Sequence, residues 1–272
     1  MPCGINLPSL GKLTLSDVKV YQDSLDALIA HSPHLEDIHL IQPAMFLDLI
    51  ASKVLKRLTI DGYIDPHKGF TISAPHLVSF ECTDYQLEDI SWRDQPTLES
   101  AHIDTCGSTF DGETKYTEML LHANKLALFG LDIKVMLDNE LPTCSAFQSL
   151  TSLEIGGWHL AEDLYAVLRL LKLSPRLEKL KLVHDSGKGA GADAQPTNGM
   201  TFGCRLLHSV TIQCTNGDEG VDKLVSVVVA NGVSLYKIHV TMTYREYIEK
   251  RASELEDKAS VAEEPAKKVR LC

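Results

Sequence analysis

Lys188 is the residue whose surroundings come closest to a nucleotide-binding motif. It lies in Gly187-Lys-Gly-Ala-Gly, which resembles a phosphate-binding loop. That loop needs Ser or Thr directly after the lysine and a helix to follow. Here the chain continues Ala-Asp-Ala-Gln-Pro-Thr-Asn-Gly, a composition typical of a flexible insertion. The segment therefore predicts no cofactor site.

Histidines and cysteines could support metal binding or nucleophilic catalysis. His31 and His34 are closest together in the sequence, but Pro33 lies between them and no third ligand is near. Cys82 falls at an inward position of an alternating segment, where a cysteine acts as a small apolar side chain. Acidic neighbours such as Glu162 and Asp163 are typical of a solvated surface. We therefore expect no catalytic residue, no metal and no enzyme activity.

Composition limits the class of fold and of partner. Of 272 residues, 44% are hydrophobic and only 6% aromatic, so the core must be mostly aliphatic. The formal net charge is −11, from 37 acidic and 26 basic residues. A chain this acidic would be repelled by a phosphate backbone. Nucleic acid is therefore not an expected partner.

Signals for secretion and membrane insertion were sought along the whole sequence. The seven cysteines are an odd number with wide spacings and no C-x-x-C pair, which does not indicate a disulfide framework. The first residues have no basic and apolar signal segment, and no apolar run is long enough to span a membrane. There is no N-x-S/T sequon. We expect an intracellular protein, cytoplasmic or nuclear, without a membrane partner.

A short apolar motif recurs along the chain with the form apolar-x-x-apolar-x-apolar. Successive motifs begin 20 to 30 residues apart, which is too regular for chance. The ten motifs begin at Leu10, Leu35, Leu55, Leu77, Leu98, Ala123, Leu150, Leu177, Leu207 and Leu235.

The period of this motif predicts the architecture. Alternation at period two indicates a short strand with its apolar side inward, and the intervening residues bring the chain back to place the next strand in parallel. Residues 23–30, 162–171 and 221–229 have helical periodicity, with Asp23 or Ser24 as the expected N-cap of the first. The shorter repeats, roughly Leu55 to Ile103, predict irregular returns.

The expected fold is thus an α/β leucine-rich-repeat solenoid, shaped as a horseshoe. Its parallel sheet lines the concave face, and helices or irregular turns form the convex face. The asparagine of the L-x-x-L-x-L-x-x-N consensus is largely missing, because Asp17, Gln42, Gly62 and Asp84 occupy or border that region instead.

The phrases around these motifs carry a family resemblance. Leu7-Pro-Ser-Leu…Leu13-Thr-Leu-Ser-Asp-Val, Ser32-Pro-His-Leu-Glu-Asp-Ile-His-Leu and Ser174-Pro-Arg-Leu-Glu-Lys-Leu-Lys-Leu resemble the repeats of plant F-box/LRR proteins. Residues 203–243 resemble the FBD-like end of that family. The resemblance implies substrate recognition for an SCF-type ubiquitin ligase. The family's F-box is expected before the repeats and is not found ahead of Leu7, so an SCF adaptor is implied only if an F-box precedes this chain.

Three segments follow from these patterns. Residues 1–243 are the expected repeat domain of about ten repeats. Residues 244–256 are expected to form a helix that caps the stack, because Tyr244, Tyr247, Ile248, Ala252 and Leu255 recur at helical spacing. Residues 257–272 are expected to be a disordered polar tail, in which Lys267, Lys268 and Arg270 fit a K-K-x-R nuclear import signal.

The outward positions of the strands are the candidate binding surface for a protein partner that the sequence does not name. Acids concentrate on the middle strands and lysines come later, which suggests an acidic patch followed by a basic end. An ordinary polar solvent face stays the alternative, as does a free-standing scaffold or inhibitor that sequesters its partner. The candidate contacts are Asp37, His39, Arg57, Asp61, Glu81, His102, Asp104, Glu154, Lys179 and Lys181.

Overall fold

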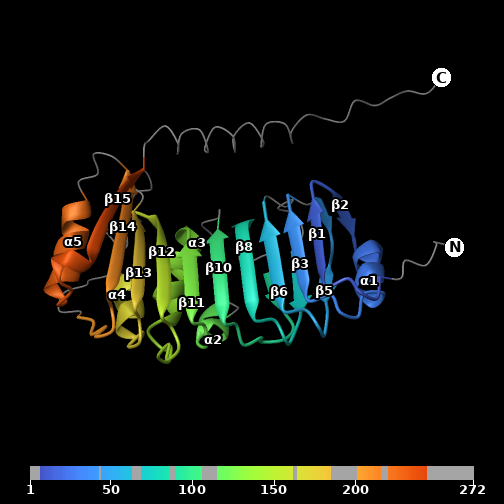
Figure 1. Ribbon diagram of the computed structural model, residues 1–272, viewed down its shortest axis with the longest axis horizontal. Coiled ribbons are helices and arrows are strands. Elements are labelled where there is room, and N and C mark those ends of the chain that lie inside the picture. Colours follow the sequence, from blue (N-terminus) through green and yellow to red (C-terminus); the bar gives the residue numbers. More distant parts are fainter. Residues whose placement is uncertain are drawn as a thin grey trace, which may run out of the picture.

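A single ten-stranded parallel sheet runs the length of the molecule in the computed structural model (Figure 1). The structure describes residues 7–42, 44–62, 69–85, 90–105, 115–161, 164–184, 201–215 and 220–243. The strands lie side by side in chain order, so each repeat contacts only its neighbours. They are β1 (Lys12–Ser16), β3 (Asp37–Ile41), β6 (Arg57–Asp61), β8 (Ser79–Tyr85), β10 (Ser100–Thr105), β11 (Lys125–Phe129), β12 (Ser152–Trp158), β13 (Lys179–His184), β14 (Ser209–Thr215) and β15 (Ile238–Thr243).

The register of the sheet confirms the ladder that the repeated motif predicted. Leu58 pairs with Phe80 and Ile60 with Cys82, so equivalent motif positions lie opposite one another. Their side chains are buried, while the residues between them face outward. The leading leucine of the motif, such as Leu55, is buried in the turn before the strand. The inward rows of successive repeats therefore form one continuous aliphatic core.

The convex layer of the shorter repeats is a second sheet, where the sequence had predicted irregular returns. Strands β5 (Leu49–Ala51), β7 (Phe70–Ser73) and β9 (Ile90–Trp92) pair in parallel. A two-stranded sheet of β2 (Lys19–Tyr21) and β4 (Ala44–Phe46) lies nearer the N-terminus. The irregular-return prediction was wrong because strands of three or four residues are too short to show a period in the sequence.

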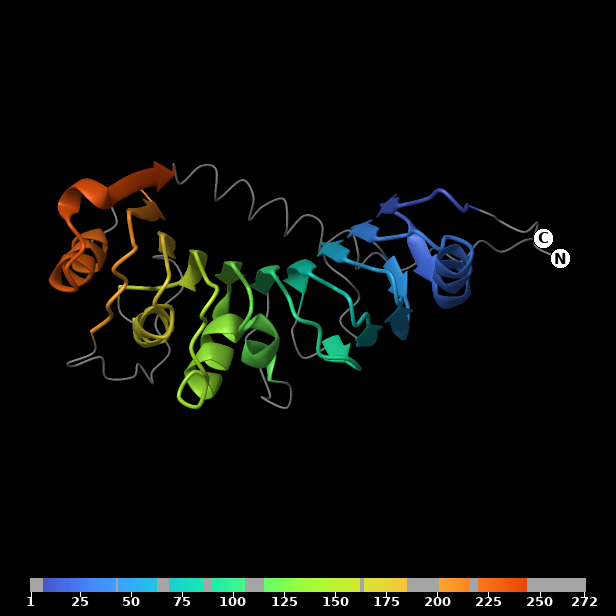
Figure 2. The ribbon, with the colours of Figure 1, turned by 60° about the horizontal axis from the view of Figure 1, so that its bottom comes forward.

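Helices form the convex layer elsewhere, on the outer side of the shallow arc of strands (Figure 2). They are α1 (Gln22–Ala30), α2 (Tyr116–Leu120), α3 (Leu131–Glu140), α4 (Tyr165–Lys172) and α5 (Val221–Ala230). The helix expected at residues 221–229 is confirmed by α5, and α4 confirms the core of the one expected at 162–171. Residues 162 and 163 lie outside the described residues.

The N-cap expected for the first helix was wrong. Helix α1 begins one residue before Asp23, and its N-cap is Tyr21, whose side chain makes no capping hydrogen bond. Gln22 is instead fixed by tertiary contacts, because its side-chain amide donates to Leu49 O (2.8 Å) and its Oε1 accepts from the N–H of Asp48 (2.8 Å). The contact with the next repeat sets the start of this helix, rather than a local cap.

A left-handed residue ends many of the concave strands. The backbone N–H of Asp17 donates to Ile41 O (2.9 Å) and that of Gly62 to Thr83 O (3.3 Å), which extends the parallel ladder by one bond while the chain turns away. Non-glycine residues at positive φ are rare, so their recurrence here marks a defined turn. The residues with this conformation are Asp17, Gln42, Gly62 and Gly130, which directly follow a strand, and Asp84 and Gly157, which are the next-to-last residues of β8 and β12. The four residues noted near the missing asparagine in the sequence all belong to this series.

Some expectations concern residues that the structure leaves undescribed. The capping helix at residues 244–256, the tail at 257–272 with Lys267, Lys268 and Arg270, and the loop around Lys188 lie outside the described residues.

Candidate binding surface

The outward side chains of the ten strands form three rows across the concave face. Because the strands are in register, Thr14 lies opposite His39 and His39 opposite Thr59 in the middle row. The same order continues along the sheet through Glu81 and His102. Each outward residue therefore has its lateral partner on the neighbouring strand, and charges on adjacent strands can pair directly.

One pair of opposite charges lies at the start of strands β3 and β6. The Arg57 guanidinium forms an ion pair with the Asp37 carboxylate. This side-chain hydrogen bond raises the pKa of Arg57, against the smaller opposing effect of desolvation. Next to it, Lys56 and Glu36 form a second ion pair at 2.7 Å. Asp37 and Arg57, two of the predicted contacts, thus largely neutralise each other's charge.

Two acids of the middle strands, Glu81 and Asp61, accept hydrogen bonds from threonine hydroxyls on neighbouring strands. Glu81 accepts a hydrogen bond from Thr59 (3.3 Å), and its other oxygen lies 3.6 Å from His102 Nδ1. Asp61 accepts from the Thr83 hydroxyl. Hydroxyl donors orient a carboxylate but leave its charge in place. We call Asp61, Glu81 and Asp104, on strands β6, β8 and β10, the central acidic patch.

The expected basic end is weaker than the sequence suggested. The Lys181 ammonium contacts the Glu154 carboxylate on the neighbouring strand, so these two predicted contacts form an ion pair. Lys179 is exposed at the start of β13. Lys237, just before the last strand, lies in a 3₁₀ turn (Leu235–Lys237) and donates to Leu207 O (2.9 Å). The acidic region is therefore the stronger electrostatic feature of this face.

Strands β11 and β14 also belong to the concave face, and none of the predicted contacts lies on them. Strand β11 contributes Lys125, Ala127 and Phe129, and the Phe129 ring centroid lies 5.8 Å from that of His102. The motif beginning at Ala123 was recognised as a weak one, and the alternation that gave the other contacts would have given these three. Strand β14 adds the uncharged outward residues Ser209, Thr211 and Gln213.

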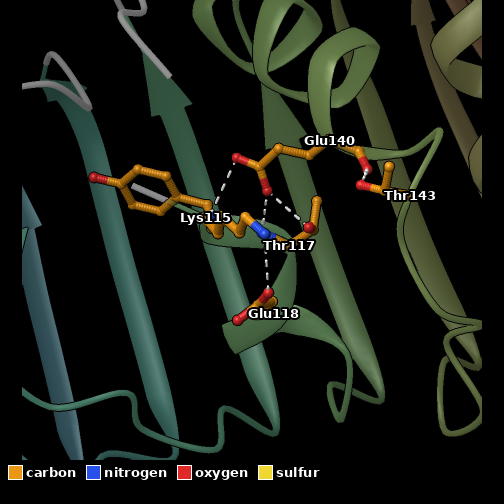
Figure 3. A network of polar contacts seen from close by, with 6 residues as sticks. Lys115, Thr117, Glu118, Glu140 and Thr143 are labelled. Carbon is orange, nitrogen blue, oxygen red and sulfur yellow. Dashed lines mark hydrogen bonds and ion pairs between the residues drawn. The ribbon is translucent and has the colours of Figure 1, made fainter. Parts of the chain in front are cut away.

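A separate hollow of about 620 Å³ lies between the loop before β10, helix α2 and the end of α3. Its central carboxylate, Glu140, accepts from the N–H and the hydroxyl of Thr117 (2.8 and 2.7 Å) and from the N–H of Tyr116 (3.3 Å) (Figure 3). Lys115 and Glu118 approach one another at 3.6 Å beside it. Glu140 thus caps the start of α2 although it lies 23 positions after Thr117 in the sequence. No motif in the sequence indicates this contact.

The described residues offer little for catalysis. They contain no group of three or more His, Cys, Asp or Glu residues that could hold a metal ion. Cys82 is buried in the sheet. In the hollow beside Glu140, burial raises the pKa of the Cys144 thiol, which opposes formation of a reactive thiolate. Within the described ranges, no helix is both long and apolar enough to cross a bilayer.

Comparison with known proteins supports the architecture and identifies the family. The model of the At1g61320/AtMIF1 LRR domain matches residues 3–264. A curated relative, the F-box protein At3g59000 of Arabidopsis thaliana, is 37% identical over 103 residues, which are 36% of this chain and 20% of that protein. The match therefore spans about a fifth of the relative's length. No solved structure matches the chain. With nearly its whole length matched, the chain belongs to the At1g61320/AtMIF1 LRR domain family.

Proposed function

We propose that this chain is a protein-binding module that recognises a basic segment of its partner with the central acidic patch. The observation that carries this proposal is the clustering of Asp61, Glu81 and Asp104 on three consecutive strands. The Arg57–Asp37 pair lies at the start of β6, at the other end of that strand from Asp61, and the Lys181–Glu154 pair lies on β12 and β13, beyond the patch. Complementary charge favours a partner with lysines and arginines and speeds its association.

The side chains of the central acidic patch are also held in fixed positions. Its members lie on strands rather than loops, and Thr59 and Thr83 orient two of the carboxylates from neighbouring strands. A surface held by rigid elements loses less conformational entropy on binding than a mobile loop would. The His102 and Phe129 rings border the patch and add aromatic contact area.

The cellular role that we propose is target selection for an SCF-type ubiquitin ligase. It is supported by the likeness to an F-box protein, and the F-box itself would have to be joined to this chain. A scaffold or inhibitor that sequesters its partner is the second candidate, favoured by the same surface without an F-box. Purification of the tagged, full-length gene product from its own cells distinguishes the two. Co-purification of a Skp-type adaptor and a cullin supports the ligase role, and their absence supports the scaffold.

The binding face is tested by charge reversal. The triple variant Asp61→Lys, Glu81→Lys and Asp104→Lys is expected to weaken binding of a partner captured by the wild-type chain by about 10-fold or more, and to lower the association rate most at low salt. The matched control, Thr211→Lys, Gln213→Lys and Thr241→Lys, adds three lysines to the same face on β14 and β15. Unchanged binding by the first variant would overturn the assignment of the patch.

A further inference from the structure

The last strand of the sheet exposes two side chains whose register partners on the preceding strand β14 are buried. Val240 lies opposite Ile212, and Met242 opposite Cys214. Ile212 and Cys214 are buried, whereas Val240 is 41% and Met242 64% exposed. The inward row of the solenoid therefore continues onto β15 without the cover that it has elsewhere in the described residues.

The uncovered area extends beyond β15 itself. Leu235 and Tyr236, in the turn before the strand, are 65% and 79% exposed. Exposed apolar side chains gathered on one strand and the turn before it are typical of a site that another element contacts. It is also the end of the sheet, so the chain's own next repeat or a partner must provide that element.

The order of elements in the helical repeats indicates what the cover is. Strand β11 is followed by α3, β12 by α4 and β14 by α5, and each of these helices belongs to the convex layer. Helix α5 packs against β14, the strand before it. By the same order, the segment that covers β15 is the one that follows Thr243.

The sequence after Thr243 has the pattern that such a cover needs. Tyr244, Tyr247, Ile248, Ala252 and Leu255 recur at spacings that place them on one face of a helix. The positions between them are rich in Arg, Glu and Lys. A second copy of the chain would be the competing occupant, but a covalently continuous segment has the advantage of a very high effective concentration.

We propose that residues 244–256 form an amphipathic helix that packs on Ile238, Val240 and Met242 and closes the C-terminal end of the solenoid. This proposal is independent of the proposed function. It assigns the exposed surface to a segment of the same chain, so the full-length chain is expected to be monomeric at this end.

Hydrogen exchange of the full chain, followed by mass spectrometry of peptides covering β14 and β15, tests the contact. The variant Tyr247→Asp with Ile248→Asp is expected to speed exchange in those peptides by about tenfold or more, because their opening becomes easier. The control Lys250→Asp with Ser253→Asp places the same residues on the opposite face of the expected helix. It is expected to exchange as the wild type does. Peptides covering β3 and β6 report whether the rest of the fold is intact.

Two results would overturn the proposal. Equal exchange in both variants would show that the apolar face of residues 244–256 does not touch the sheet. Protection of β15 that depends on protein concentration in the wild type would assign the surface to a second copy. The reciprocal variant Val240→Asp is expected to reproduce the fast exchange from the strand side.

Discussion

The two halves of this solenoid share one concave sheet but have different convex layers. Between β3 and β10 the chain returns through strands β5, β7 and β9. Beyond β11 it returns mainly through helices α3, α4 and α5. Repeat starts are 20 to 22 residues apart in the first region after Leu35, and 27 to 30 apart after Ala123. A short repeat has room for a three-residue strand on the way back, and a long one has room for a helix.

This difference has a geometric consequence. Strands pack about 4.8 Å apart, so a repeat with strands in both layers is equally wide on both faces. A helix is about 10 Å across, so helical repeats are wider on the convex side and bend the stack. Repeat length thus sets the width of the convex layer, although the concave register is the same throughout.

The left-handed turns at the strand ends differ between the halves in the same way. In the N-terminal half, Asp17, Gln42 and Asp84 adopt this conformation with a side chain, and Gly62 is the glycine of the series there. In the C-terminal half the position is glycine, and a Cβ on Gly157 would lie 2.7 Å from the backbone nitrogen of Gly130. Closer stacking of successive turns, as well as backbone conformation, therefore requires glycine there.

The largest expected effects come from matched aromatic truncations in the two halves. Phe80→Ala and Trp158→Ala each remove a fully buried ring and are expected to lower the free energy of unfolding by about 3–5 kcal/mol. Because repeat arrays are stabilised by nearest neighbours, each loss should be felt mainly in its own half. Hydrogen exchange measures this. Equal acceleration in both halves by each variant would show that the two halves unfold as one unit.

The turn comparison predicts the next largest effect. Gly157→Ala is expected to lower the free energy of unfolding by about 2–3 kcal/mol, because it adds a Cβ at positive φ against a neighbouring backbone. Gln42→Ala keeps a Cβ that is already accommodated at φ 46 and should cost less than about 1 kcal/mol. Urea unfolding of both variants checks the pair. Equal losses of unfolding free energy in the two variants would contradict the proposed difference in turn stacking.

The ion pairs on the concave face are expected to contribute little to the free energy of unfolding in either half. Arg57→Gln and Lys181→Gln are each expected to change the free energy of unfolding by about 0.2–1 kcal/mol, because both pairs are partly exposed and screened. Double-mutant cycles with Asp37→Asn and Glu154→Gln measure each coupling. A coupling well above this range in one half would show that its face is less solvated than the exposures indicate.

The last effect appears only at alkaline pH and is confined to the C-terminal half. Burial raises the pKa of Cys204 to about 11, from an ordinary value of 9.0. Its thiol lies 3.4 Å from the carbonyl oxygens of Leu171 and Ser174, contacts that need the proton. The unfolded chain loses this proton first, so the stabilising contribution is complete below pH 9.0 and is lost as pH rises toward 11.

Thermal unfolding between pH 8 and pH 11 checks this contribution against the variant Cys204→Ser. We expect the wild type to lose more stability with rising pH than the variant does. A parallel decline in both proteins would contradict a role for the thiol proton.

Much of the concave face could be predicted because alternation fixes which side each residue faces. The inward positions of β6 and β8, and the outward Asp61 and Glu81, follow from the motif alone. The convex sheet could not be predicted, because Leu49–Ala51 is too short to show a period. The cap at Glu140 joins residues far apart in the sequence, and the expected N-caps of α1 failed because tertiary contacts of Gln22 replace them.

For the candidate binding surface, the sequence predicted which side chains face outward but not which of them form ion pairs with one another. Glu154 and Lys181 are 27 positions apart, and only the register of β12 and β13 brings them together. The charge trend along the sequence therefore overstated the basic end, because the Glu154 carboxylate neutralises the charge of Lys181.

The strict register also limits how a partner can be recognised. Adjacent strands repeat about every 4.8 Å, whereas residues of an extended peptide repeat about every 3.4 Å. A peptide lying across the strands would thus fall out of step with the rows after two or three residues, and a one-residue-per-repeat code cannot operate. For the proposed binding surface, this register favours recognition over a local footprint of a few strands, which is the width of the central acidic patch.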